Sequence, residues 1–210
     1  MSELIHVENL RKNFPVQKNL LDQIFAGVKK SYVHAVDDIS FVLKKGEVLG
    51  LAGESGSGKS TTGRLLLRLL DPTSGSIKYN GVELSDKSTR EMQAFRKKMQ
   101  VVFQDPNSSL SPRMRVGDAI GHPLKIHTNM NQQERTASVI DLMEKVGLTP
   151  ATFLYNKYPH QLSGGQSQRV VLARALITNP EFIVADEPIA MADVSVRAMI
   201  LELMKDLKKE

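Results

Sequence analysis

Two early stretches of the chain are predicted to be β-strands, and the second alternates apolar and polar residues with the period of two that half-buried strands show. They cover residues 4–10 and 39–43, whereas residues 15–34 between them lack the pattern and are interpreted as a long loop. Further along, Asn80-Gly81 separates two short apolar stretches, which is the signal of a type I′ β-hairpin. These features predict an antiparallel β subdomain in the first half of the chain.

Three short stretches are mainly apolar and are interpreted as strands, the last of them as a buried strand of the parallel type. They are Glu47–Ala52, Met99–Phe103 and Phe182–Ala185. A helical stretch is predicted after the first run, from Lys59 to Leu70, where Asp71-Pro72 should stop it. Strands followed by helices in this way indicate an α/β core.

Residues 106–162 contain no convincing strand and carry helical periodicity instead. Asn131 and Glu134 have the spacing of a capping box for one helix in this region, and Ser163 can cap the helix that follows it. A last apolar helical face extends over residues 196–207. An α-helical subdomain inserted into the α/β core is therefore expected.

The composition narrows the class of protein. A chain of 210 residues with 41% hydrophobic residues can bury one ordinary core, so one domain is expected. Zero cysteines exclude a disulfide framework, a thiolate nucleophile and a cysteine-ligated metal within these residues. The net charge of +5 comes from interspersed acidic and basic residues, which we interpret as a solvated surface rather than a nucleic-acid interface. No apolar run approaches the roughly 18 residues of a membrane span, so a cytoplasmic location is expected.

The first candidate binding motif is the glycine-rich segment Gly53–Ser60, which we call the phosphate loop. Its sequence matches G-x-x-x-x-G-K-S/T and lies between a predicted strand and a predicted helix, as that motif requires. Its glycines allow backbone N–H groups to turn toward one anion, Lys59 can reach the outer phosphates and Ser60 can ligate Mg²⁺. A turn that only capped a helix would not need Lys59 and then Ser60. ATP and Mg²⁺ are the expected cofactors.

Two carboxylates, Asp186 and Glu187, follow the apolar run Phe182–Ala185. Ligands of open α/β sheets bind at the carboxyl edge of such strands. One carboxylate can hold Mg²⁺ and the next can polarise the attacking water in phosphoryl transfer. Taken alone, an acidic pair at this place is more often only a helix N-terminal feature. Beside the phosphate loop, the catalytic interpretation is favoured.

A second glycine-rich helix start is Leu162-Ser163-Gly164-Gly165-Gln166, which we call the signature segment. An ordinary capped helix would explain Ser163 but neither the two glycines nor Gln166. A helix start without side chains suits an anion at close range, yet the phosphate loop already serves this chain's own nucleotide. With these motifs the sequence resembles the ATP-binding cassette (ABC) family, whose LSGGQ signature covers the γ-phosphate of an ATP bound to the partner subunit. The resemblance covers essentially the whole chain.

This resemblance implies a P-loop NTPase core of about 1–105 and 163–210, with the helical subdomain at about 106–162. It implies Glu187 as catalytic base with Gln104 of the Q-loop, and Ser60, Gln104 and Asp186 as Mg²⁺ ligands. Either Phe14 or Tyr32 should stack on adenine. The other residues that it implies for nucleotide binding are Gly53, Glu54, Ser55, Gly56, Ser57, Gly58, Lys59, Ser60, Thr61, Ser163, Gly164, Gly165, Gln166 and Asp193 of the D-loop.

Finer resemblance narrows the substrate. Residues 35–38, 53–58, 103–113 and 158–163 are similar to the dipeptide and oligopeptide importers, a subfamily that also includes nickel importers. The implied partners are a second ABC ATPase subunit, membrane permeases and, indirectly, a substrate-binding protein, with the chain on the cytoplasmic face of the membrane. The alternatives are a soluble ABC-type ATPase of DNA repair or translation, and a nucleotide-binding remnant without turnover. The cysteines, coiled-coil insertion and tandem cassettes of the soluble classes are absent from this sequence.

The sequence departs from the family pattern in three places. Ala190 stands where the D-loop usually has serine, and Ser167 follows the signature segment where a basic residue is common. The five histidines all precede Asp186, so none matches the switch histidine that the family places after the last helix. The sequence ends at Glu210, and we therefore interpret it as lacking its C-terminal part.

Overall fold

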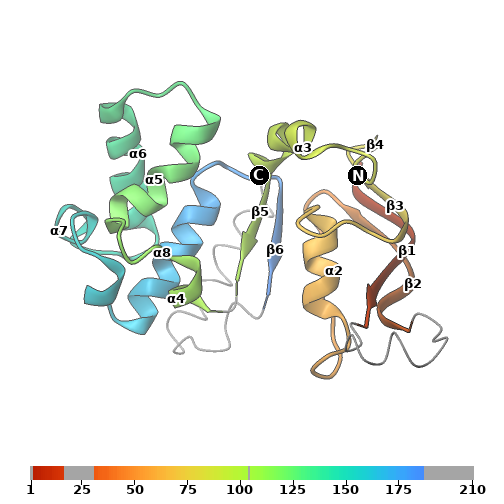
Figure 1. Cartoon of the computed structure of the whole chain (residues 1–210). Coiled ribbons are helices and arrows are strands. Elements are labelled where there is room, and N and C mark those ends of the chain that lie inside the picture. The colour runs from red at the N-terminus through yellow and green to blue at the C-terminus, as the bar shows by residue number, and fades with distance from the viewer. Residues whose placement is uncertain (1, 17–30, 104, 187–210) are drawn as a thin grey trace, which may run out of the picture. The chain divides into compact units, whose positions relative to one another are not determined.

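The computed structural model describes residues 2–16, 31–103 and 105–186 (Figure 1). The chain divides into two compact units, Met1–Met92 and Gln93–Glu210, and the passage between them lies within helix α3 (Thr89–Arg96). The last helical face that the sequence predicts, at residues 196–207, lies outside the described residues. None of the described helices is both long enough and apolar enough to traverse a bilayer.

The first unit is built on a four-stranded antiparallel sheet with the strand order β2-β1-β3-β4. Its strands are β1 (Glu3–Pro15), β2 (Tyr32–Lys44), β3 (Ser74–Tyr79) and β4 (Val82–Glu83). Ile5 and Val7 of β1 pair with Tyr79 and Ile77 of β3, and all four side chains are buried. The antiparallel β subdomain is confirmed, and these cross-strand pairs of β1 and β3 lie on one buried apolar face of the sheet.

The tight turn between β3 and β4 confirms the predicted hairpin. Asn80 and Gly81 have φ values of 47° and 77°, and Tyr79 pairs with Val82 on either side of them. A type I′ turn requires a positive φ at both central residues, which asparagine and glycine adopt most readily. The turn therefore follows from these two residues alone.

Helix α2 (Lys59–Leu66) ends four residues before Leu70, where the sequence predicts its end. Arg68 adopts a positive φ of 51°, and its Nε donates to the carbonyl oxygen of Leu84 at 2.9 Å. The N–H of Leu69 turns back to the carbonyl oxygen of Arg64 at 2.9 Å, which satisfies one of the free carbonyl groups at the helix end. A contact with a distant residue thus overrides local helix propensity.

The strand predicted at Glu47–Ala52 is wrong for this structure, since these residues form neither strand nor helix. Val48, Leu49 and Leu51 expose 73%, 46% and 46% of their surface. No strand pairing among residues 2–16, 31–103 and 105–186 includes them. A buried strand needs hydrogen-bonded neighbours on its edges, and without them an apolar run alone does not form one.

The second unit packs helices against a pair of parallel strands, β5 (Met99–Val102) and β6 (Phe182–Ala185), whose parallel pairing confirms the prediction. Its helices are α4 (Pro106–Ser109), α5 (Val116–His127), α6 (Gln132–Lys145), α7 (Ala151–Tyr155), the 3₁₀ turn η1 (Pro159–Gln161) and α8 (Gly164–Leu176). Helix α8 packs against α4, α5 and α6 (Figure 1). Between Pro106 and Leu162 the structure contains helices and no strand, as expected.

The core of the second unit is shared between the helices of the insertion and α8. Ile120, Met143 and Val170, from α5, α6 and α8, are fully buried in one apolar cluster. The capping box predicted for α6 is present, because the N–H of Glu134 donates to Asn131 Oδ1 at 3.0 Å and the N–H of Asn131 donates to Glu134 Oε2 at 2.7 Å. These reciprocal bonds fix where α6 begins.

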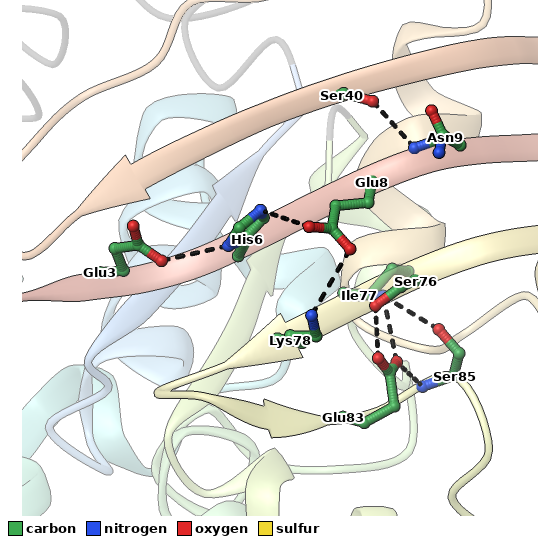
Figure 2. Close-up of polar contacts among 10 residues, drawn as sticks. All are labelled: Glu3, His6, Glu8, Asn9, Ser40, Ser76, Ile77, Lys78, Glu83 and Ser85. Atoms are coloured by element: carbon green, nitrogen blue, oxygen red, sulfur yellow. Dashed lines mark hydrogen bonds and ion pairs between the residues drawn. The ribbon is translucent and has the colours of Figure 1, made fainter.

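Polar side chains form contacts along β1 and between β1 and β3 in the sheet of the first unit (Figure 2). His6 on β1 contacts Glu3 through Nδ1 and Glu8 through Nε2, each at 3.1 Å. Glu8 Oε2 lies 3.5 Å from Lys78 Nζ on β3. An exposed ion pair such as that of Glu8 and Lys78 stabilises a fold by less than about 1 kcal/mol.

Glu83 on β4 forms the stronger contacts of this sheet. Its Oε1 accepts the N–H groups of Ile77 at 3.1 Å and Ser85 at 2.9 Å, and its Oε2 accepts the hydroxyl of Ser76 (Figure 2). Burial acts to raise the pKa of the Glu83 carboxyl, but the hydrogen bonds from Ser76, Ser85 and Ile77 together outweigh it and lower the pKa to about 2.

The Glu83→Gln variant should show a pH-dependent loss of stability. Because the pKa of Glu83 is lower in the folded state than its ordinary value of about 4.3, its contribution is complete above that value and is lost as the pH falls toward about 2. The melting temperatures of wild type and variant should therefore differ at pH 7 and converge between pH 4 and pH 2. Thermal unfolding over that range measures this, with exposed Glu144→Gln as the control. A difference that does not change with pH would contradict the assignment.

Candidate functional site

The phosphate loop leads into α2, and the side chain of Lys59 reaches back across the loop to its first residues. Lys59 Nζ donates to the carbonyl oxygens of Gly53 and Glu54, both at 2.6 Å, and lies 3.4 Å from Ser57 Oγ. The first turn of α2 contains no acidic residue, so nothing there neutralises the positive end of the helix dipole. The ammonium group and the helix N-terminus thus present positive charge at the same loop, which suits a phosphate group.

Three glycines of the phosphate loop have positive φ values, and two of them, Gly58 and Gly56, differ in why glycine is needed. Gly58 has a φ of 89°, and an added Cβ would lie 2.1 Å from the carbonyl oxygen of Ala35 on β2. Gly56 has a φ of 83°, yet an added Cβ would meet nothing within 4 Å. Gly58 is therefore required by packing against β2 as well as by its backbone conformation, whereas Gly56 is required by conformation alone.

The first turn of α2 carries the polar residues that follow the lysine. Thr62 donates its hydroxyl to the carbonyl oxygen of Gly58 at 3.0 Å and its N–H to the same oxygen at 2.8 Å, which closes the turn. Ser60 is exposed and Thr61 is half-buried. Ser60 therefore remains accessible for the Mg²⁺ that the sequence predicts there.

The two aromatic candidates for adenine stacking lie at the paired ends of β1 and β2. Phe14 pairs with Val33 and Tyr32 pairs with Pro15, so the two rings belong to neighbouring cross-strand pairs. Neighbouring pairs project to opposite faces of a sheet. Both rings are exposed, and Lys12 Nζ lies 5.0 Å from the centre of the Phe14 ring. Only one of the two aromatics can therefore face a base bound near the phosphate loop.

In the second unit, the signature segment forms the N-terminus of α8. Ser163 Oγ accepts the N–H of Gln166 at 3.3 Å, and Gln166 Oε1 accepts the N–H of Ser163 at 3.0 Å. The inference that capping leaves Gln166 unexplained is wrong, because Gln166 completes a capping box with Ser163. The cap does not require Gly164, where an added Cβ would meet nothing within 4 Å.

The carboxylate predicted to act on the metal side follows β6. The N–H of Asp186 donates to the carbonyl oxygen of Val102 at 2.9 Å, and Ala185 pairs with Val102 at the ends of the two parallel strands. Gln104, Glu187 and Asp193 lie outside the described residues, so their predicted roles stay predictions. No group of three or more His, Asp and Glu side chains among the described residues could hold a metal ion, and the Mg²⁺ ligands remain predicted.

Comparison with known proteins agrees with these motifs. The family model described as ABC transporter matches residues 36–190. The chain is 51% identical over 187 residues to the putative oligopeptide transport ATP-binding protein YkfD of Bacillus subtilis, covering 89% of this chain and 56% of that protein. It is 44% identical over 207 residues to the dipeptide transport ATP-binding protein DppF of Haemophilus influenzae, covering 99% of this chain and 61% of that protein. The chain thus spans less than two thirds of either relative.

A solved structure extends the similarity to three dimensions. The dimeric post-hydrolysis state of the ATP-binding cassette MJ0796, bound to ADP and Pi, superposes with a TM-score of 0.85 at 29% sequence identity. The superposition covers 98% of this chain and 83% of the cassette chain. A family match over residues 36–190, close relatives over nearly the whole chain and a shared fold lead to one conclusion. The chain belongs to the ABC transporter family and has the P-loop NTPase fold of its ATP-binding cassettes.

Proposed function

We propose that this chain is the ATP-binding and ATP-hydrolysing subunit of an ABC importer that energises the uptake of dipeptides or oligopeptides. The observation that carries the proposal is that two helices, α2 and α8, begin in glycine-rich segments and have no acidic residue in their first turn. At α2, Lys59 already lies across the loop that would receive the β- and γ-phosphates. At α8, an added Cβ at Gly164 would meet no atom of the described residues within 4 Å, which leaves space beside the helix start.

Those two features support a head-to-tail dimer with ATP between the phosphate loop of one subunit and the signature segment of the other. Mg²⁺ would be held by Ser60, Gln104 and Asp186, and Glu187 would act as general base on the attacking water. The cassette MJ0796, to which this chain is similar, is described as a dimer bound to ADP and Pi. The substrate class rests on the names of YkfD and DppF, which are oligopeptide and dipeptide transport proteins. Permease subunits at the cytoplasmic face of the membrane are the proposed partners.

The Glu187→Gln variant tests the proposal. Removing a general base should lower the rate of phosphate release at saturating ATP and Mg²⁺ by roughly 100- to 10,000-fold while ATP still binds. In cells that lack the gene, the wild-type gene should restore uptake of a labelled dipeptide and the variant should not. Glu144→Gln, an equivalent change at an exposed position of α6, should behave as wild type in both assays. A wild-type protein that binds ATP without releasing phosphate would refute the enzymatic part of the proposal. Turnover without peptide uptake would refute the substrate class.

A further inference from the structure

Arg174 is a half-buried cation on α8 whose guanidinium bonds to the backbone of a different element. Its Nη1 donates to the carbonyl oxygen of Ser109, the last residue of α4, at 2.6 Å. Burial lowers the pKa of Arg174, since desolvation disfavours its charged form. No carboxylate forms an ion pair with it among the described residues. Burying a charge is costly unless the charge is hydrogen-bonded or paired, so the bond to the Ser109 carbonyl group offsets part of that cost.

On the other side of this bond, Ser109 closes the single helical turn α4. The hydroxyls of Ser109 and Ser108 donate to the carbonyl oxygen of Asp105 at 2.8 Å and 3.0 Å, and the N–H of Ser108 lies 3.3 Å from Asp105 Oδ2. A helix of one turn is not stable by itself, because nucleation costs more than so few bonds return. The turn therefore depends on its anchors, and Asp105, which starts it, directly follows Gln104 in the sequence.

Helix α8 is a rigid support for this anchor. Val170 and Ala173, which precede Arg174, are fully buried in the core of the second unit. Gly164 and Arg174 belong to the same uninterrupted helix and are separated by about 15 Å at a rise of about 1.5 Å per residue. The helix that begins with the signature segment therefore also carries the cation that holds α4.

We propose that Arg174 is a positioning residue, which holds α4, and with it the backbone that follows Gln104, in fixed register with the helix of the signature segment. It touches neither nucleotide nor metal and acts through the Ser109 carbonyl group alone. Catalytic groups must be held within about 0.5 Å of their productive geometry, so loss of this anchor should slow the chemical step without changing nucleotide binding. The inference rests on the proposed function, because the reaction it affects is ATP hydrolysis.

The same helix offers a matched control. Arg169 Nη1 donates to the carbonyl oxygen of Gly147 at 2.8 Å, which is the same kind of bond directed to the end of α6. We expect Arg174→Met to lower kcat about tenfold or more with KM for ATP unchanged, and Arg169→Met to leave kcat unchanged. Arg174→Lys, which keeps the charge and a donor, should recover much of the rate. In hydrogen exchange, the amides of residues 107–110 should lose protection in Arg174→Met and keep it in Arg169→Met.

The outcomes separate the two proposals. Equal losses of kcat in Arg169→Met and Arg174→Met would mean that loosening of α8 is the cause, and would overturn the positioning role. An unchanged kcat in Arg174→Met, measured beside an active wild type, would overturn it as well. If the wild type shows no turnover, the proposed function fails instead. The exchange measurement then still decides the structural part, because retained protection of residues 107–110 would show that Arg174 does not hold α4.

Discussion

Replacing Lys59 with alanine is expected to weaken ATP binding by roughly 10- to 100-fold and to leave the fold intact. In the structure the Lys59 ammonium bonds to the carbonyl oxygens of Gly53 and Glu54, so it already lies over the loop. Hydrogen bonds to charged groups contribute about 1.5–3 kcal/mol each, and about 1.4 kcal/mol corresponds to a factor of ten in affinity. Titration with a fluorescent ATP analogue measures the change.

Lys45→Ala is the matched control for this experiment. Lys45 is an exposed lysine of the same unit, in the turn after β2, and the change removes the same charge from the protein. Its affinity for the analogue should equal that of wild type, which would show that the general positive field is not the cause. Circular dichroism should give the same spectrum for all three proteins. An affinity unchanged by Lys59→Ala would remove the phosphate loop from the functional argument.

Predictions from the sequence are confirmed where the cause lies in adjacent residues. The hairpin at Asn80-Gly81 depends on two residues that tolerate a positive φ, and both adopt it. The capping box of Asn131 and Glu134 depends on groups three residues apart, and its bonds form as expected. The glycines of the signature segment mark it in the sequence, although Gln166 also has a capping role that its spacing from Ser163 could have indicated. Interactions over three or four residues can therefore be predicted from the sequence itself.

Predictions fail, or cannot be made, where the cause lies far along the chain. Helix α2 ends at Leu66, and just beyond it the Arg68 guanidinium bonds to the backbone of Leu84. No pattern in the sequence near Leu66 predicts that contact. Glu47–Ala52 has the composition of a buried strand but lacks a pairing partner among the described residues. Apolar composition indicates that a segment is suited to burial, but it does not identify the strand with which that segment would pair.

Contacts with a backbone carbonyl group are a further class that the sequence does not reveal. Gly58 requires glycine because the Ala35 carbonyl oxygen approaches it, and any residue at position 35 would supply that oxygen. Arg174 bonds to the Ser109 carbonyl group in the same way. The partner in such a contact carries no side-chain signal. Residues of this kind can be found only once the fold places the two segments together.

Gly164→Glu is expected to abolish ATP-dependent dimerisation without harming the subunit itself. The fold leaves room for the new side chain, since an added Cβ at Gly164 would meet nothing within 4 Å. The first turn of α8 contains no acidic residue, so a glutamate there also interacts favourably with the helix dipole, by about 0.3–1 kcal/mol. Ser163 is a less informative position, because its hydroxyl caps the helix and its replacement costs about 0.5–2 kcal/mol of stability.

In the proposed dimer, that carboxylate would be placed against the γ-phosphate bound by the partner subunit, where like charges repel. Size-exclusion chromatography with light scattering, in Mg²⁺ and a non-hydrolysable ATP analogue, should show a dimer for wild type and a monomer for Gly164→Glu. Nucleotide affinity of the monomer and its melting temperature should not fall, because the phosphate loop and the packing of α8 are unaltered. Ala137→Glu, the same charge change at an exposed position of α6, should still dimerise. A Gly164→Glu protein that dimerises like wild type would mean that the signature segment does not face the partner's nucleotide.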